Sequence, residues 1–305
     1  MIVAAIQLDA ELGNVQFNYS KAFELVKQAI AKHAQLIVLP EFFTSAMALN
    51  PIMEEVARRN VELDIPQQFL ELSVHHGCVI AGSYLSILCG DIYNSMILQF
   101  PNGERLVHNK DIPTQFENRY YTTGDRLRSK SHVGVALCWE MIRSQTLLEM
   151  PLNIRIVAAG SCWWDLPCQS NGAALRDYNH QLDHDTPPRL AAFLGVPVIH
   201  ASHVGIVTGF KNSVSDSIVD RQLIGRTQII NKTGQIQNEL DIAASDTVLV
   251  DVVEIPEVGI RAETPSGFWT VNLPHQYLEA WDRENRSGQE YYQMNRARMV
   301  GNSAT

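Results

Sequence analysis

The amino-acid sequence predicts one α/β domain with a β-rich second half and a C-terminal extension. Short apolar runs alternate with helical patterns through the first two-thirds of the 305 residues. From about Val214 to Val252 the chain becomes rich in strand-like segments. No fixed-period repeat or low-complexity linker divides it, so we expect one domain over residues 1–265. Residues 266–305 form the extension, for which a subunit interface is one candidate packing site.

The first half of the chain alternates between buried strands and a helix. The helix is expected over Lys21–His33, because its apolar residues recur every three or four positions and share one face. A Pro-Asn-Gly turn at residues 101–103 joins the last two strands. The strands are expected at Ile2–Leu8, Leu36–Leu39, Cys78–Leu85, Tyr93–Gln99 and Arg105–Asn109.

The middle of the chain continues this alternation. A helix is expected near Ile142–Glu149. Another begins at the two prolines 187 and 188, runs to about Leu194 and ends at Gly195, since proline suits a first helical turn and glycine the position after the last. Buried strands are expected at His132–Leu137, Ile154–Ala159 and Val196–Ala201.

Composition and charge argue against several classes of partner. The net charge of −9 is spread without runs of one sign, whereas nucleic acids and anionic membranes require clustered Lys and Arg. No segment approaches the ~20 apolar residues of a membrane span, and the N-terminus lacks the pattern of a signal peptide. Glycine-rich phosphate loops are missing, so no nucleotide is expected. Five irregularly spaced cysteines predict free thiols in a reducing cytoplasm.

Three residues with complementary chemistry follow predicted strands. Glu41 follows the strand LIVLP, Lys110 ends the strand RLVHNK, and Cys138 ends the strand HVGVALC. The carboxyl ends of parallel strands meet at one rim of a sheet, where ligands bind. We therefore expect an acid, an ammonium and a thiol to lie together at this rim.

These residue types together suit nucleophilic catalysis. A thiol attacks as its thiolate, and a neighbouring carboxylate can take its proton and return it to a leaving amine. A lysine ammonium favours the thiolate and stabilises an oxyanion, for which the backbone N–H of Trp139 is a second candidate donor. Each residue alone also has an ordinary interpretation: Cys138 as a small buried side chain, Glu41 as a carboxylate at a helix N-terminus, and Lys110 as a solvated strand end.

The local sequences around these residues resemble the motifs of the nitrilase superfamily of carbon–nitrogen hydrolases. The matching segments occur in the family's order over residues 1–255. The resemblance implies a four-layer αββα sandwich, a Glu-Lys-Cys triad, no metal or organic cofactor, and assembly into a homodimer or higher homo-oligomer. The segments are Leu36–Phe43 around the glutamate, Tyr93–Ser95 and His108–Pro113 around the lysine, Gly134–Glu140 around the cysteine, and Arg189–Gly205 downstream.

The resemblance also implies a second glutamate that helps to position the substrate, and Glu117 is at the matching place. Its alternative is a loop carboxylate paired with Arg119. The expected activity is cleavage of a small amide through a thioester. Nitrile cleavage is the second possibility, because Trp139-Glu140 follow the cysteine as in many nitrile-cleaving members. A catalytically idle binding protein and an acyltransferase are the remaining alternatives.

Other residues were weighed for a role in the site. Trp163 follows a strand and is expected to line the pocket, with ordinary aromatic packing as its alternative. His180 and His184 have the spacing of two metal ligands on one helix face, but a solvated, hydrogen-bonded loop is the favoured interpretation, so no metal is expected. Cys162 is a rival nucleophile without motif partners and is expected in the pocket wall or core. The other thiols are interpreted as core or surface residues: Cys78, Cys89 and Cys168.

Overall fold

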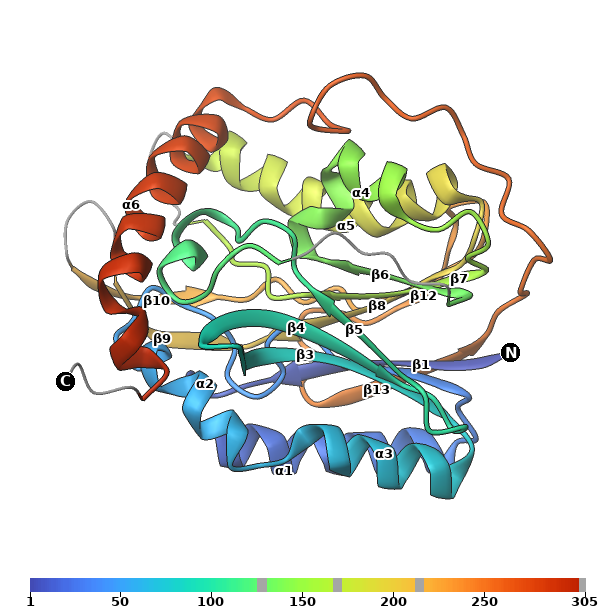
Figure 1. Cartoon of the computed structure of the whole chain (residues 1–305). Coiled ribbons are helices and arrows are strands. Elements are labelled where there is room, and N and C mark those ends of the chain that lie inside the picture. The colour runs from blue at the N-terminus through green and yellow to red at the C-terminus, as the bar shows by residue number, and fades with distance from the viewer. Residues whose placement is uncertain (125–130, 167–171, 212–216, 302–305) are drawn as a thin grey trace.

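The fold has four layers, two sheets packed face to face with helices on both outer sides (Figure 1). The computed structural model describes residues 1–124, 131–166, 172–211 and 217–301. Cys168 and the first residues of the predicted β-rich segment, 214–216, lie outside these ranges. The predicted αββα sandwich is confirmed.

The first sheet has the strand order β13-β1-β2-β3-β4-β5. β1, β2 and β3 run parallel, whereas β4, β5 and β13 pair antiparallel to their neighbours. The Pro-Asn-Gly turn lies between β4 and β5 as predicted. The strands are β1 (Ile2–Asp9), β2 (Leu36–Val38), β3 (Val79–Leu88), β4 (Asp91–Gln99), β5 (Arg105–Asn109) and β13 (Thr247–Val252).

The second sheet has the order β6-β7-β8-β11-β12, with β6, β7 and β8 parallel. A short pairing of β1 with β8, at Leu8 and Asp9, joins the two sheets. A separate antiparallel ribbon is made by β9 and β10. The strands are β6 (Val133–Leu137), β7 (Ile156–Ser161), β8 (Val198–Val204), β9 (Ile206–Lys211), β10 (Ile218–Gln222), β11 (Gln228–Ile230) and β12 (Ile236–Glu239).

The strands form because their apolar faces meet between the sheets. Side chains from β1, β2, β3 and β4 pack against side chains from β6, β7, β8 and β11 in one core that is shielded from water. Burying this apolar surface contributes roughly 25 cal/mol per Å². The outer faces are covered by α1 (Val15–Ala31) and α3 (Ile65–His76) on the first sheet and by α4 (Ser144–Glu149) and α5 (Ala173–Leu194) on the second.

Two helix predictions were wrong in their boundaries. α1 begins at Val15 rather than Lys21. Its first turn was missed because the polar Asn18 lies on the buried face, where it donates to the carbonyl oxygens of Glu11 and Thr44. A polar residue on the buried face hides the apolar pattern of that turn. α2 (Met53–Val61) and α3 were not predicted at all.

The second error concerns α5, which runs from Ala173 to Leu194 and contains both prolines in its interior. Proline removes a helical N–H, so the carbonyl four residues earlier loses its partner. The carbonyl of His184 instead accepts a hydrogen bond from Nε2 of Gln228 (3.3 Å), and Oγ1 of Thr186 donates to the carbonyl of Leu182. The side chains therefore support a continuous helix where proline predicted a start.

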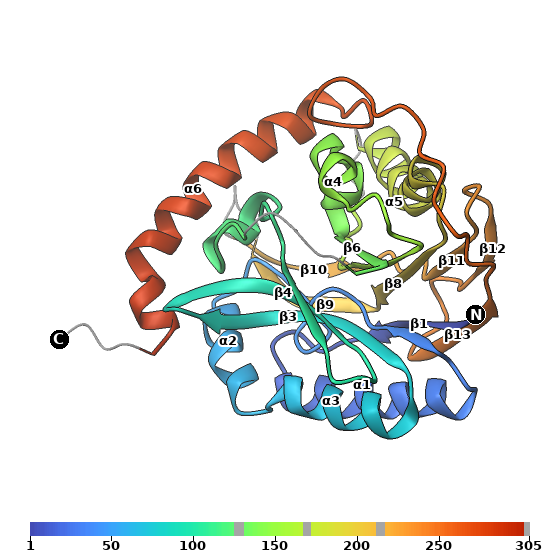
Figure 2. The ribbon, with the colours of Figure 1, turned by 45° about the vertical axis from the view of Figure 1, so that its right-hand side comes forward.

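The C-terminal extension ends in a long helix, α6 (His275–Met299), which runs beside the two sheets at one end of the sandwich (Figures 1 and 2). It packs on its own domain: the hydroxyl of Tyr292 accepts from the N–H of Ile92 in β4, and Asn285 accepts from Asn118. None of the described helices has the length and apolar character that crossing a membrane requires.

Candidate active site

The residues singled out in the sequence lie at the ends of strands from both sheets. Glu41 follows β2, Lys110 follows β5 and Cys138 follows β6. The first two strands belong to one sheet and β6 to the other, so the candidate site lies where the ends of the sheets meet. The backbones approach closely here, because a side-chain carbon at Gly160 in β7 would lie 2.8 Å from the backbone nitrogen of Glu41.

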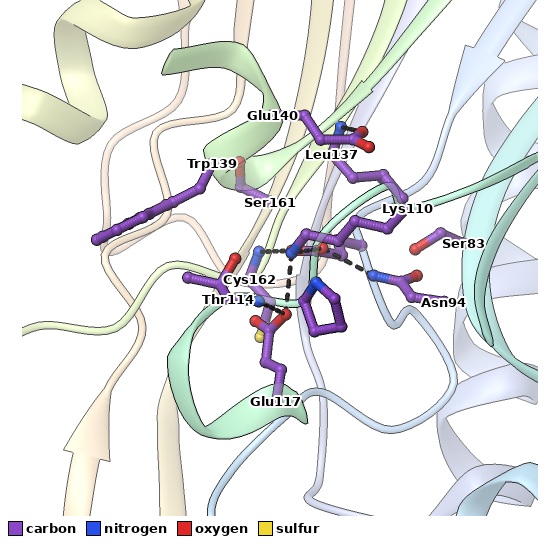
Figure 3. Close-up of polar contacts among 12 residues, drawn as sticks. Ser83, Asn94, Lys110, Thr114, Glu117, Leu137, Trp139, Glu140, Ser161 and Cys162 are labelled. Carbon is purple, nitrogen blue, oxygen red and sulfur yellow. Dashed lines mark hydrogen bonds and ion pairs between the residues drawn. The ribbon is translucent and has the colours of Figure 1, made fainter. Parts of the chain in front are cut away.

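Lys110 is the centre of a buried ion-pair cluster. Its Nζ donates to Oε1 of Glu41 and to Oε2 of Glu117, both at 2.9 Å, and the three side chains are at most 1% exposed. Asn94 donates from Nδ2 to the same oxygen of Glu41 (2.9 Å), and the hydroxyl of Tyr121 donates to Glu117. Figure 3 shows Glu117 reaching toward Lys110, with Asn94 on the other side of the cluster. Three of the predicted residues are thus brought together.

Cys138 begins a tight turn from β6 into the short 3₁₀ helix η2 (Cys138–Ile142). Its φ of +50° is left-handed, a conformation that costs a non-glycine residue on the order of 1–3 kcal/mol. Such a strand-to-helix elbow presents a side chain at the end of a sheet. The thiol of Cys138 is buried, and the charges of Glu41 and Lys110 both act on it.

Burial sets the proton affinities in this cluster. It raises the pKa of Glu41 to about 7, against the opposing attraction of Lys110 and with added repulsion from Glu117. Burial and the charge of Glu41 also raise the pKa of Cys138 well above its usual range, although Lys110 lowers it. For Lys110 itself burial lowers the pKa, but Glu117 and Glu41 outweigh burial and raise it well above the usual value. The site therefore holds a protonated thiol, a permanent ammonium and a carboxyl that titrates near neutrality.

A second buried cluster joins the segments that carry Lys110 and Cys138, and no motif indicated it. Glu140 accepts at Oε1 from the backbone N–H of Asp111 and from Nε2 of His108, both at 2.9 Å. Its Oε2 accepts from the N–H of Leu137 (2.8 Å). Asp111 comes directly after the lysine and Leu137 directly before the cysteine, so one carboxylate fixes both. Arg143 completes the cluster with an ion pair to Asp111 (2.7 Å).

A cavity of about 190 Å³ opens beside Cys138. Part of its wall is aromatic and includes Trp139 and Trp163, both of which are buried. The predicted position of Trp163 in a pocket wall is therefore observed. The cavity is also lined by residues of η1 (Gln115–Arg119), of the β9–β10 ribbon and of α6: Phe116, Phe210, Arg221, Gln276, Tyr277, Ala280 and Glu284.

Helix α6 supplies the aromatic residues that hold Trp139. The indole of Trp139 stacks on Tyr277 and on Trp281, with ring centroids 5.7 Å apart in both pairs. Asn179 of α5 ties the same wall together, because its Oδ1 accepts from the Tyr277 hydroxyl (2.7 Å) and from Nε1 of Trp163 (2.9 Å). The residue next to the cysteine is thus packed by the last helix of the chain.

The remaining candidates also have defined partners. The backbone N–H of Cys162 donates to Oε2 of Glu41 (3.1 Å), and its side chain lines the cavity, as expected for a wall residue. Arg119 does not pair with Glu117 among the described interactions; its guanidinium lies over the ring of Tyr291, 3.7 Å from the centroid. That position contradicts the alternative of a simple surface ion pair for Glu117.

The two histidines of α5 have separate carboxylate partners. His180 contacts Asp165 and His184 contacts Asp185, each at 2.9 Å. Within the described ranges, no group of three His, Cys, Asp or Glu side chains is arranged to hold a metal ion. The histidines are hydrogen-bonded as expected, but they lie within helix α5 and not in the loop that was predicted.

Fold and site together define a class: an αββα sandwich with a buried Glu–Lys pair beside a cysteine on a strand-to-helix elbow. The family model described as carbon-nitrogen hydrolase matches residues 2–255. The chain therefore belongs to the carbon–nitrogen hydrolase family, and it is an enzyme of that class. Residues 276–284 of α6, which line the cavity, lie beyond the matched part.

Individual relatives are distant. The chain is 23% identical over 259 residues to a nitrilase of Pyrococcus abyssi (strain GE5 / Orsay), a match that covers 81% of this chain and 90% of the relative. Its structure is similar to that of a carbon-nitrogen hydrolase from Helicobacter pylori G27, with a TM-score of 0.68, 16% identity, and coverage of 96% and 92%. It also resembles a cysteine mutant of the amidase from Nesterenkonia sp. AN1 in complex with butyramide, with a TM-score of 0.63, 16% identity, and coverage of 82% and 89%.

Proposed function

We propose that this enzyme hydrolyses the carbon–nitrogen bond of a small amide through a thioester on Cys138. The observation that carries the proposal is the buried Glu41–Lys110 pair, whose charges act on a buried thiol that lines an aromatic cavity. The amidase from Nesterenkonia, which has the same fold, binds butyramide in its cysteine mutant, and that supports an amide as substrate.

In the first step Glu41 takes the proton of the Cys138 thiol while the sulfur attacks the carbonyl carbon. The raised pKa of Cys138 means that the resting group is a thiol, so a base is required. Glu41, with a pKa of about 7, can both accept this proton and return it to the departing nitrogen as the C–N bond breaks. Water then attacks the thioester and gives one proton to Glu41, which passes it to the sulfur as the acid leaves.

Lys110 stabilises the negative oxygen that develops on the substrate. Its pKa stays well above the usual value, so it remains an ammonium throughout the reaction. In a buried site a fixed cation of this kind requires no reorganisation when charge develops. The backbone N–H of Trp139 is the second proposed donor. Glu117 holds the ammonium from the opposite side, at 2.9 Å, and so directs Lys110 toward the substrate.

A nitrile is the second candidate substrate, because Trp139-Glu140 follow the cysteine and one relative is a nitrilase. The same residues would form a thioimidate on Cys138, which water converts to the acid and ammonia. In this chain Glu140 is committed to His108 and to two backbone N–H groups, so it is a positioning residue and not a second base. The Trp139-Glu140 pair therefore supports nitrile cleavage only as a sequence resemblance, because the contacts of Glu140 give it no role in attacking a nitrile.

The decisive experiment is a panel of primary amides, carbamoyl amines and nitriles, assayed for ammonia with wild-type enzyme and with Cys138→Ala. We expect amides to be turned over and the variant to be inactive. Intact-mass spectrometry should detect an acyl adduct in the wild type that is absent from Cys138→Ala. Full activity in that variant would disprove the mechanism, and absence of any adduct or ammonia across the panel would favour the idle binding protein.

We propose the reducing cytoplasm as the compartment, since the described cysteines are all free thiols. Recovery of the native protein from a secreted fraction would contradict that choice. The homo-oligomer implied by the family resemblance stays a prediction, and a molecular mass of about 34 kDa in light scattering would exclude it.

A further inference from the structure

The cavity contains a cation that the proposed chemistry does not use. Arg221, in β10, lines the same cavity as Cys138. Its guanidinium lies over the ring of Phe210, 5.1 Å from the centroid. Phe210 belongs to an aromatic group with Phe116 and Trp164, whose ring centroids are 4.8 to 6.0 Å apart. Arg221 is therefore held against an apolar wall in a fixed orientation.

The guanidinium of Arg221 has N–H donors without an acceptor among the described residues. Its hydrogen bond to the described residues runs from Nη1 to the backbone oxygen of Asp165, at a long 3.4 Å. Nε is buried and has no acceptor among the described residues. An arginine binds a carboxylate best through two parallel N–H donors, and the Nε side of Arg221 offers such an edge.

The neighbouring Arg176, by contrast, has carboxylate acceptors for its guanidinium. Its Nε and Nη2 both donate to the carboxylate of Asp165, which also contacts His180. That carboxylate is thus occupied. Burial lowers the pKa of Arg221, and the charges of Asp165 and of Glu284, which lines the same cavity, oppose this shift.

We propose that Arg221 is the subsite for a carboxylate on the substrate, remote from the amide that Cys138 attacks. The inference rests on the proposed function and adds the substrate class: an amide whose apolar middle packs on the wall of Phe116, Trp164 and Phe210 and whose far end is anionic. Such a group would take the two donors that Arg221 leaves open and neutralise its charge within the cavity.

The test uses matched pairs of substrates and does not depend on turnover. Monoamides of linear dicarboxylic acids of increasing length are each compared with the amide in which a methyl group replaces the carboxylate. Calorimetry on Cys138→Ala protein gives the dissociation constants, and kcat/KM is measured on the active enzyme. We expect one chain length to bind on the order of 10- to 100-fold more tightly than its neutral partner, the usual effect of a charge-assisted hydrogen bond.

Variants assign this preference to Arg221. In Arg221→Met the ratio between the members of the pair should fall to near one, and in Arg221→Lys, which keeps the charge but loses the two-donor edge, it should be intermediate. Arg189→Met is the matched control, because Arg189 lies on α5 outside the cavity and its removal changes the net charge equally. Melting temperatures verify that each variant folds.

The outcomes separate the two proposals. Equal binding of carboxylate and neutral amides at every length, or a preference that survives Arg221→Met, would overturn the carboxylate subsite while leaving amide hydrolysis intact. Tight carboxylate binding without ammonia release would instead support the subsite and count against the proposed reaction.

Discussion

The buried ion-pair cluster of Glu41, Lys110 and Glu117, here called the floor, and the aromatic wall of the cavity beside Cys138 are built on different physical principles. The three residues of the floor are fully buried, are not among the residues that line the cavity, and are held by charged hydrogen bonds of 2.9 Å. On the wall, aromatic rings line the cavity together with Arg221, which lies over the ring of Phe210 and is only partly buried. Buried charges are costly unless their geometry is fixed, whereas apolar surfaces tolerate changes of shape.

We propose that this difference reflects two roles, the chemical step on the floor and substrate selection on the wall. The floor lies entirely within the matched family segment, residues 2–255, whereas α6 lies beyond it. We propose that the floor carries out the chemical step. The wall formed by α6 and the β9–β10 ribbon is the proposed place where the acyl group is selected. Variants on the two surfaces should therefore affect kcat and KM differently.

The largest effect is expected for Glu41→Gln, which preserves the shape of the side chain but removes the base. We expect kcat to fall by about 10²- to 10⁴-fold, as for other lost general bases, with little change in KM. Steady-state kinetics on an amide measures both. Glu62→Gln, an exposed carboxylate in the C-cap of α2, is the control and should behave as wild type. A large rise in KM with unchanged kcat would break the proposed division between floor and wall.

Next in size is Glu140→Gln, because it leaves the His108 ring and two backbone N–H groups of the floor with a poorer acceptor. Removing one partner of a buried ion pair typically costs about 3–5 kcal/mol of stability. Urea unfolding should detect this loss, and kcat should fall while KM is retained. Unchanged stability would mean that the segments that carry Lys110 and Cys138 are held by other contacts.

The pH dependence is the third test of the floor. The proposed base is the carboxylate form of Glu41, which exists above its pKa of about 7. kcat/KM should therefore rise with pH up to about 7 and be roughly 100-fold lower two pH units below that midpoint. Because the pKa of Lys110 is raised, no loss of the ammonium is expected just above neutrality. A flat profile between pH 5 and 8 would contradict the role of Glu41.

The smallest effect is expected on the wall, for Tyr277→Phe. This change removes the hydrogen bond from the Tyr277 hydroxyl to Asn179 (2.7 Å), worth about 1 kcal/mol. KM should rise several-fold with kcat nearly unchanged. Tyr178→Phe is a matched control, since it also loses one hydroxyl hydrogen bond, to Asn272, but does not line the cavity. Equal effects of the two changes would show that the loss is one of general stability.

The sequence was informative where a polar or reactive residue directly follows a strand-like run. Glu41, Lys110 and Cys138 stand out for this reason, but the structure places them at the ends of strands from both sheets and not at the rim of one parallel sheet. Glu140 could not be predicted, because its role depends on a contact with His108, 32 positions away along the chain. Such a contact leaves no local pattern.

The helices that were missed or misplaced have different causes. Of the 25 residues of α6 only Tyr277, Gly288, Tyr292 and Met299 are buried, so the helix has no continuous apolar stripe to recognise. In α5 the two prolines gave a misleading start signal, because the helix continues through them and a side-chain hydrogen bond from Gln228 takes the place of one of the two missing N–H groups. Arg221 likewise lies in no sequence motif. Its proposed role depends on its buried Nε, which has no acceptor among the described residues.

The stacking of Trp139 between Tyr277 and Trp281 bears on the order in which the protein becomes functional during synthesis. When a ribosome has released both sheets, the charged floor can already form, yet the indole beside the nucleophile still lacks the rings that hold it. We expect the aromatic wall of the cavity to be complete only when the last helix docks. A nascent chain would therefore form the charged cluster beside Cys138 before the cavity wall is complete.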